Sequence, residues 1–529
     1  MCGALPRVLR RRCVPGYGPV CHAPGVAASP PPPVPHAAAP QHVPPLAARA
    51  NGTAPRGNSP AAQLGLSALT IALLFGVVLV APLPLWAGQP VGPPGPDASP
   101  PSAIGWPGLV IALVLVLGLC LPFRPYRHAL DAASRLSEAA AGTRVLVGLT
   151  AALALVALLI YPRFGSDIFD YVGFERTWVV YGENPLIGTP ASHPDDWATP
   201  LVWYAGQPPA YGPLWAILTW PIVRLAGDSA TLAVAGYKIL AAAAYALCCV
   251  LVWSLVPPPR QKRALVLFAW SPLVLFEVLG KVHNDVVIAA GVLGAIWLVQ
   301  RGHERLSLAA AVGAALGKLT ALAVAPPIAV RLWRVGGWRA VLPAALGAAV
   351  LVGLVYAPFW AGPATVQPLL HQTGRVVWSP GTLLLLLAGA FDLGPPPPDV
   401  LVRLVLVAIW LISCGVILRA TRLANAAEVA ACSGRLLLSS LLLLTTAVFG
   451  HYLVPAVALA AVSADARLEQ WVFWLSIGGL AAYAVELLAL AFGPEWIGSA
   501  GYQLTGSLVL LVPALVATLS SPPPTAGQT

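Results

Sequence analysis

The segment Ser166-Asp167-Ile-Phe-Asp170-Tyr171 contains the two acidic residues best placed for chemistry. Asp167 and Asp170 are three residues apart, so a helix would place them on one face, and they closely follow an apolar run over residues 144–161. A carboxylate at the end of an apolar segment is partly desolvated, which raises its basicity and suits it to accept a proton from a hydroxyl group. The simpler interpretation is that both acids only face water or cap a helix, and by position alone this interpretation has the greater weight.

Two further polar features interrupt apolar runs. One is the cluster Lys281-Val-His283-Asn284-Asp285, and the other is Lys318 within Gly-Ala-Ala-Leu-Gly-Lys-Leu-Thr. The cluster could be only a solvated hairpin, but an ionisable group inside an apolar segment is a candidate functional residue. Lys318 either extends its ammonium group to a surface or meets an anion, for which a phosphate is a plausible partner.

Two weaker signals lie further along the chain. His371, Arg375 and Trp378 follow the apolar run that ends at Trp360, and Gly450-His451-Tyr452 interrupts a later one. Such residues more often form an interfacial belt than a binding site. The sequence has no Gly-x-x-x-x-Gly-Lys phosphate loop, no His-Glu-x-x-His zinc motif and no nucleophile elbow. We therefore expect any chemistry to use residues from loops and helix ends.

The hydrophobic composition of the chain indicates that membrane-spanning segments position these residues. Hydrophobic residues make up 58% of the 529 residues and charged residues only 9%, whereas soluble domains carry about 25% charged residues. Such a surface suits lipid rather than water, and the apolar runs are near the length needed to cross a bilayer. The net charge of +10 is scattered through short loops rather than gathered in a basic patch, so we expect no nucleic-acid partner.

We predict an all-α polytopic membrane protein with about 12–14 transmembrane helices. Residues 1–60 form a Pro/Ala-rich tail that we expect to be disordered and cytoplasmic. Residues 61–143 supply two leading spans and a basic loop, residues 144–465 a membrane core, and residues 466–529 the last spans and a short tail. The predicted spans lie at about 63–87, 104–122, 144–161, 229–256, 264–279, 285–300, 306–332 (two short helices), 340–360, 400–419, 435–464 (two, broken at Gly450), 470–492 and 504–520.

Orientation follows from the arginine and lysine residues, which are enriched in cytoplasmic loops. With both termini in the cytoplasm, most basic loops also fall there. Residues 162–228 then form one extracytoplasmic loop, provided that the segment from Tyr211 to Pro221 lies along the interface rather than crossing the membrane. The candidate residues Asp167, Asp285 and Lys318 all fall on the extracytoplasmic side.

Taken in order, these motifs resemble the GT-C superfamily of membrane glycosyltransferases, and most closely its polyprenol-phosphate-mannose-dependent mannosyltransferases of actinobacterial type. The resemblance covers about residues 144–465. It departs at Leu186, where a tyrosine is usual, in having a single aspartate directly after Ser166, and in its extra N-terminal tail and two leading spans. The matching stretches are Ser166–Tyr171, Glu175-Arg176, Gly182–Pro185, Tyr211–Pro213, His283–Asp285 and Gly317-Lys318.

The resemblance implies that a sugar, expected to be mannose, moves from a polyprenyl-phosphate donor to a hydroxyl of a lipid-linked or cell-wall glycan, with inversion. Asp167 would be the general base, with Asp170 as the second catalytic carboxylate. Lys318, Arg375 and His451 would neutralise the leaving phosphate. No cofactor is expected, although two carboxylates facing a phosphate could hold a divalent metal. The remaining residues expected to bind donor or acceptor are Tyr171, Arg176, Asn184, Tyr211, His283, Asn284, Asp285 and Tyr452.

Two other classes of protein stay open from the sequence. A multi-pass transporter or lipid-linked sugar flippase would also need many spans, but it often shows internal repeats and a polar path at the midplane. The two halves of this chain show no convincing repeat, and its polar residues gather at one membrane face, which favours an enzyme. A structural membrane protein would leave the long acidic loop unexplained.

Overall fold

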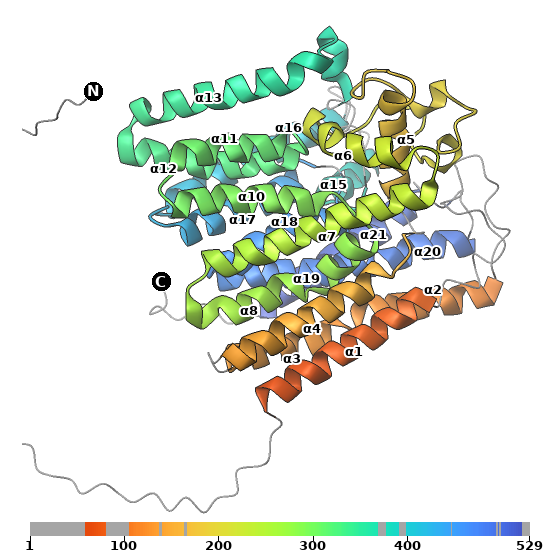
Figure 1. The fold of residues 1–529 in the computed structure, drawn as a ribbon, viewed down its shortest axis with the longest axis vertical. Coiled ribbons are helices and arrows are strands. Elements are labelled where there is room, and N and C mark those ends of the chain that lie inside the picture. Colours follow the sequence, from red (N-terminus) through yellow and green to blue (C-terminus); the bar gives the residue numbers. More distant parts are fainter. Residues whose placement is uncertain are drawn as a thin grey trace, which may run out of the picture. The chain divides into compact units, whose positions relative to one another are not determined.

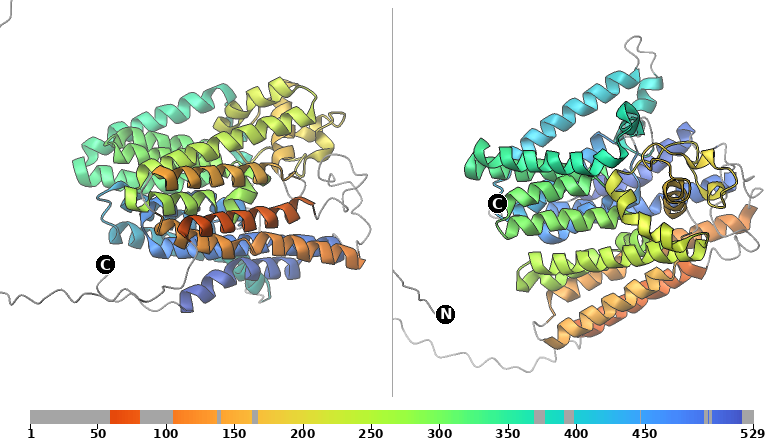
Figure 2. Two further views of the ribbon diagram at one scale, coloured as in Figure 1. Left: turned by 60° about the horizontal axis from the view of Figure 1, so that its bottom comes forward. Right: turned by 45° about the horizontal axis from the view of Figure 1, so that its top comes forward.

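A computed structural model describes residues 59–80, 105–136, 140–162, 167–368, 377–390, 398–445, 447–492, 496 and 499–520. These residues fold into helices that run alongside one another (Figures 1 and 2). Within the described ranges the only β-pairing is an isolated bridge between Val377 and Ala447. The predicted all-α fold is confirmed. The predicted tail, residues 1–60, lies almost wholly outside the described residues.

The first half of the described chain contains the helices up to residue 300, with the long loop between the helix that ends at Leu158 and the helix that begins at Ala230. The order is α1 Pro60–Val80, α2 Gly105–Cys120, α3 Phe123–Ser134, α4 Ala140–Leu158, α5 Asp167–Val179, α6 Pro213–Ala226, α7 Ala230–Leu255, α8 Pro258–Ala269, α9 Pro272–Val274, the π-helical turn η4 Leu275–Gly280 and α10 Asp285–Gln300.

The second half continues with shorter and broken helices before returning to long ones. The order is α11 Glu304–Ala315, the 3₁₀ segment η5 Leu319–Val324, α12 Ala325–Gly336, α13 Trp338–Tyr356, α15 Pro380–Ala390, α16 Pro398–Ala420, α17 Ala426–Leu443, the 3₁₀ turn η8 Gly450–Leu453, α18 Val454–Ser463, α19 Ala466–Ala481, α20 Tyr483–Phe492 and α21 Ala500–Ser520.

The described residues contain eight helices long and apolar enough to cross a bilayer, and nine if α8 and the following segment Pro272–Gly280, bent by 46°, count as one span. The predicted 12–14 crossings also counted shorter runs such as α10 and α18, which fall below that length. The predicted breaks are confirmed: η5 separates α11 from α12, and η8 precedes α18. By contrast, α3 and α15 lie outside every predicted span.

The outer helices expose apolar side chains where a soluble protein would place charges. On α13, Leu346 and Val350 are exposed, and on α16, Leu404 and Ile412 are exposed. These side chains suit a hydrocarbon environment, since exposed apolar area of this extent drives aggregation in water. Inside the bundle, small residues allow close packing: a Cβ at Gly478 of α19 would overlap the Leu510 carbonyl of α21, so only glycine fits there.

The long loop, predicted over residues 162–228, gathers at one end of the bundle (Figure 1). It contains α5 and α6, which pack against each other and against α7. Helix α6 includes most of the segment from Tyr211 to Pro221 that is predicted to lie along the interface. The centre of the bundle is α10, which packs between α7, α11 and α18 and begins at Asp285. The first residue of α5, the turn before α10 and the turn η8 before α18 lie close together.

Candidate active site

Asp167 is the first residue of α5, and its carboxylate is 28% exposed. The Tyr211 hydroxyl donates to Asp167 Oδ2 at 2.8 Å, and the Tyr171 hydroxyl approaches the same oxygen at 3.4 Å. Burial, and next the negative charge of Asp167, raise the pKa of the Tyr211 phenol well above its usual range, so this hydroxyl remains a donor. The contacts fix one oxygen of Asp167 and leave the other directed toward the centre of the site.

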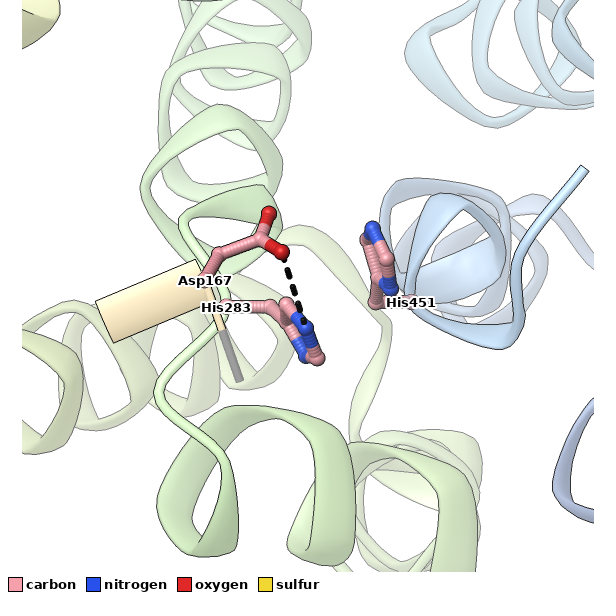
Figure 3. A group of neighbouring side chains, drawn as sticks. All are labelled: Asp167, His283 and His451. Atoms are coloured by element: carbon pink, nitrogen blue, oxygen red, sulfur yellow. Dashed lines mark ion pairs between the residues drawn. The ribbon is translucent and has the colours of Figure 1, made fainter. Parts of the chain in front are cut away.

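Two histidines face that second oxygen (Figure 3). His283 Nε2 lies 4.0 Å from Asp167 Oδ1, and the His283 ring stacks on the His451 ring with 3.8 Å between centroids and 11° between planes. His283 belongs to the turn before α10, and His451 belongs to η8. The structure thus brings together three predicted site residues that are far apart in the sequence.

Glu277 is a site residue that the sequence analysis missed. It is fully buried in the π-helical turn η4, and its Oε2 lies 2.9 Å from His283 Nδ1. The Tyr483 hydroxyl donates to the same Oε2 at 3.2 Å, and Lys281 Nζ donates to the Tyr483 hydroxyl at 3.2 Å. A lone glutamate inside the apolar run 264–279 was the available signal, because an acid at membrane depth is itself a functional candidate. Single π-helical turns are also frequent at functional sites.

Lys318 does not simply extend to the surface: it pairs with Asp285. Its Nζ lies 2.8 and 2.9 Å from the two Asp285 carboxylate oxygens and 4.3 Å from the centroid of the Tyr452 ring. Asn284 Oδ1 is a more distant partner at 3.5 Å, and the Asn284 N–H donates to the Tyr171 hydroxyl at 3.1 Å. The second predicted acidic motif is therefore connected to the first through Tyr171.

Backbone hydrogen bonds join the Tyr211 segment to the Lys318 segment. Gly212 N–H donates to the Gly317 carbonyl at 3.0 Å, and Leu214 N–H donates to the Leu316 carbonyl at 3.2 Å. Since Tyr211 holds Asp167 and Lys318 holds Asp285, this contact fixes the distance between the two acidic residues.

We expect Gly212→Ala to disturb that contact and to lower catalytic activity at least about tenfold, because small displacements of catalytic groups have large effects on rate. A Cβ at Gly212 would overlap the Leu316 carbonyl. Gly206→Ala is the matched control in the same loop, because a Cβ there meets nothing within 4 Å. Equal activities of the two variants, measured on equal amounts of folded protein, would contradict the positioning role of this contact.

Three predicted site residues lie in structural contacts of the loop instead. Asp170 accepts the Trp203 N–H at 2.7 Å, and the Asn184 side chain donates to the Phe359 carbonyl at 2.7 Å and accepts the Leu186 N–H at 3.0 Å. Arg176 is buried and contacts two aspartates and a backbone carbonyl: Asp196 at 2.8 Å, Asp228 at 2.8 Å and the Gly227 carbonyl at 2.7 Å. The geometry gives these side chains a role in holding the loop together.

The predicted residues after α13 divide in a similar way. Arg375 and His371 lie outside the described residues. Trp378 is buried beside Phe449 and Tyr502 rather than directed at Asp167. The Phe449 ring in turn stacks on the His451 ring, with 5.7 Å between centroids, so this aromatic group packs against the imidazole.

Glu175, on α5, makes the loop sensitive to pH. Burial raises the pKa of its carboxyl to about 8, despite a hydrogen bond from Thr219 at 2.9 Å. The folded protein therefore keeps a proton on Glu175 that the unfolded chain loses near pH 4.5. The contribution of Glu175 to the free energy of unfolding is thus complete below pH 4.5 and is lost as the pH rises to about 8.

We expect the melting temperature in detergent to fall between pH 5 and pH 9, with Glu175 contributing on the order of 4 kcal/mol to the loss. Glu175→Gln, which keeps the shape but cannot ionise, should remove this part of the slope. Asp195→Asn, at an exposed position of the same loop, should leave it unchanged. An unaltered slope in Glu175→Gln would show that Glu175 is ionised in the folded protein.

The fold and the site define a multi-pass membrane protein whose acidic, basic and imidazole groups meet where apolar helices end. No curated protein matches the chain. The family model for the N-terminal domain of alpha-(1->6)-mannopyranosyltransferases matches residues 64–334, about half of the sequence. The chain belongs to this family and is a membrane mannosyltransferase of the GT-C type. The matched residues include Asp167 and Lys318 but end before His451.

Proposed function

We propose that the protein transfers mannose from a polyprenyl-phosphate donor to a hydroxyl of a lipid-linked or cell-wall glycan, at the extracytoplasmic face of the membrane. The observation that carries this proposal is the position of Asp167, whose partly exposed carboxylate lies at a helix end beside buried charged groups. The catalytic core proposed from the sequence, residues 144–465, contains Asp167, Asp285, Lys318 and His451.

In the proposed reaction Asp167 is the general base. The acceptor oxygen forms a bond to the anomeric carbon as the bond from that carbon to the phosphate oxygen breaks. The acceptor proton passes to the Asp167 carboxylate, and the polyprenyl phosphate leaves with the bonding electron pair. A single displacement of this kind inverts the anomeric configuration, so a β-linked donor gives an α-linked product, in keeping with the linkage in the family description.

The leaving phosphate gains negative charge, and Lys318 is the cation placed to receive it. Its side chain is 12% exposed, and its Nζ lies close to both the Asp285 carboxylate and the Tyr452 ring. Asp285 holds the ammonium in place, and in the proposed reaction a phosphate oxygen must reach the part of the side chain that remains exposed. Preorganised charge of this kind stabilises developing charge without reorganisation during the reaction.

The donor can be tested directly with membranes that contain the full-length protein. We would supply radiolabelled polyprenyl-phosphate mannose or radiolabelled nucleotide-linked mannose, with a crude lipid-glycan acceptor and an inhibitor of endogenous polyprenyl-phosphate-mannose synthesis. We expect label transfer from the lipid donor only, and sensitivity of the product to an α-mannosidase. Transfer from the nucleotide donor alone would overturn the proposal.

The side of the membrane is a separate measurement. Sealed vesicles of known orientation should transfer label only when the acceptor is added to the face that corresponds to the outside of the cell. Transfer confined to the cytoplasmic face would reverse the proposed topology while leaving the family assignment intact.

A further inference from the structure

We propose that Asp167, His283 and His451 form a binding site for a divalent transition-metal ion of the zinc class. Each residue offers one ligand atom, and these three atoms all lie within 4.8 Å of one another. They come from α5, from the turn before α10 and from η8, and Figure 3 shows the carboxylate and both rings facing a common space.

The set of donor atoms selects the kind of ion. Two imidazoles and one carboxylate are a ligand set of catalytic zinc sites, which keep the fourth position open for water or a substrate oxygen. Magnesium and calcium prefer oxygen ligands throughout, so a site with two histidines favours zinc, or another transition metal that binds imidazole.

One ring nitrogen of each histidine lacks the hydrogen-bond partner that a purely structural role would give it. His283 and His451 are 1% and 6% exposed, and neither His283 Nε2 nor His451 Nδ1 has a hydrogen-bond partner within the described part of the chain. Buried polar atoms are normally paired, so each orphaned ring nitrogen calls for an explanation. A metal ion between the rings and Asp167 would satisfy them.

The surroundings also match those of a metal site. A metal-bound histidine commonly directs its other ring nitrogen at a carboxylate, which fixes the ring and increases its basicity. Here Glu277 Oε2 lies 2.9 Å from His283 Nδ1, leaving Nε2 on the side of Asp167. The distance between Glu277 Oε2 and His283 Nδ1 is that of an ion pair, but the two groups do not have the geometry of a hydrogen bond. On the other side, Tyr211 holds Asp167 Oδ2 and leaves Oδ1 toward the histidines.

Binding requires a small rearrangement. Ligand atoms around a tetrahedral zinc ion at about 2.0–2.1 Å lie roughly 3.3 Å apart, whereas His283 Nε2 and Asp167 Oδ1 are 4.0 Å apart. The stacked rings must tilt so that their nitrogens converge on one point. His451 lies in a short 3₁₀ turn between two helices, where a ring rotation does not disturb a longer element.

The inference does not depend on the donor proposed above, because it rests on the ligand geometry. It does bear on Asp167: a cation at Oδ1 withdraws electron density from the carboxylate and weakens it as a base. The metal-bound and metal-free forms should therefore differ in transfer rate. The proposed metal site itself is tested by measuring metal binding and does not require a measurement of activity.

The test uses purified full-length protein without a polyhistidine tag, stripped with a chelator and then equilibrated with zinc chloride. Bound metal is measured by elemental mass spectrometry and affinity by calorimetry. We compare the intact protein with His451→Ala, with the double variant His283→Ala/His451→Ala, and with His128→Ala, which removes an exposed imidazole of α3. All other histidines and cysteines are kept in every variant, so metal bound elsewhere cancels in the comparison.

We expect the intact protein and His128→Ala to bind one more zinc ion per chain than the double variant, and zinc to raise the melting temperature of the first two only. Glu277→Gln should retain the ion with roughly 10–100-fold weaker affinity, an effect that a loosely associated ion would not show. Equal zinc content in the intact protein and the double variant, with both folded by circular dichroism, would overturn the proposal.

Discussion

Asp167→Asn should lower mannosyl transfer by about 10²–10⁴-fold while leaving the amount of folded protein unchanged. The amide keeps the size of the carboxylate, and its carbonyl oxygen can still accept the hydrogen bond that Tyr211 donates to Asp167 Oδ2 at 2.8 Å. It cannot accept a proton from the acceptor hydroxyl. The measurement is the initial rate of label transfer from polyprenyl-phosphate mannose, normalised to protein by immunoblot.

Two other aspartates of the same loop sharpen this result. Asp195→Asn, at an exposed position, should retain full activity. Asp170→Ala removes the side-chain acceptor of the Trp203 N–H, so it should lower the melting temperature and the rate together. If Asp167→Asn kept the intact rate, Asp167 would not be the base, and Asp170 or Asp285 would be the next carboxylate to test.

Lys318→Met should both destabilise the protein and abolish most of its activity, and the two effects can be separated. The substitution leaves the Asp285 carboxylate, 1% exposed, without the ammonium that lies 2.8 Å away. Breaking a buried ion pair on one side costs about 3–5 kcal/mol. Loss of the charge that faces the leaving phosphate should lower the rate by about 10²–10³-fold.

The double variant Asp285→Asn/Lys318→Met distinguishes structure from chemistry. It removes both charges, so the melting temperature should return most of the way to that of the intact protein. The transfer rate should stay low, because no cation then faces the phosphate. Recovery of the rate along with the stability would show that Lys318 only neutralises Asp285.

Much of the membrane fold could be predicted from apolar run length, because the hydrocarbon thickness fixes how many residues a span needs. The helix α3 escaped this method: it is short and amphipathic, and it buries only one face, with Tyr126 among the buried residues. The Tyr126 hydroxyl donates to the Leu267 carbonyl of α8 at 2.6 Å. Such a partner, far away in the sequence, leaves no trace in the local composition.

The candidate site shows the same division between local and distant information. Asp167, His283, Asp285, Lys318 and His451 could be selected singly, because each is a polar group at the end or break of an apolar run. Their convergence comes from packing, and their roles stay predictions. Arg176 was selected by its motif, but its partners Asp196 and Asp228 lie 20 and 52 residues away. Spacing alone could not reveal that its charge is already neutralised within the loop.

The stacked pair His283 and His451 joins two parts of the chain that the boundary of the matched family region separates. His283 lies within the matched family region, residues 64–334, and His451 lies beyond it. A fragment limited to the matched region would keep Asp167, Asp285 and Lys318 but leave one face of the His283 ring bare. Two separately expressed pieces, divided at the turn between α16 and α17, would have to reassemble, with α10 packed on α18 and the two rings in contact, before a complete site existed. The C-terminal helices thus contribute part of the candidate site itself, in addition to any role in holding the protein in the membrane.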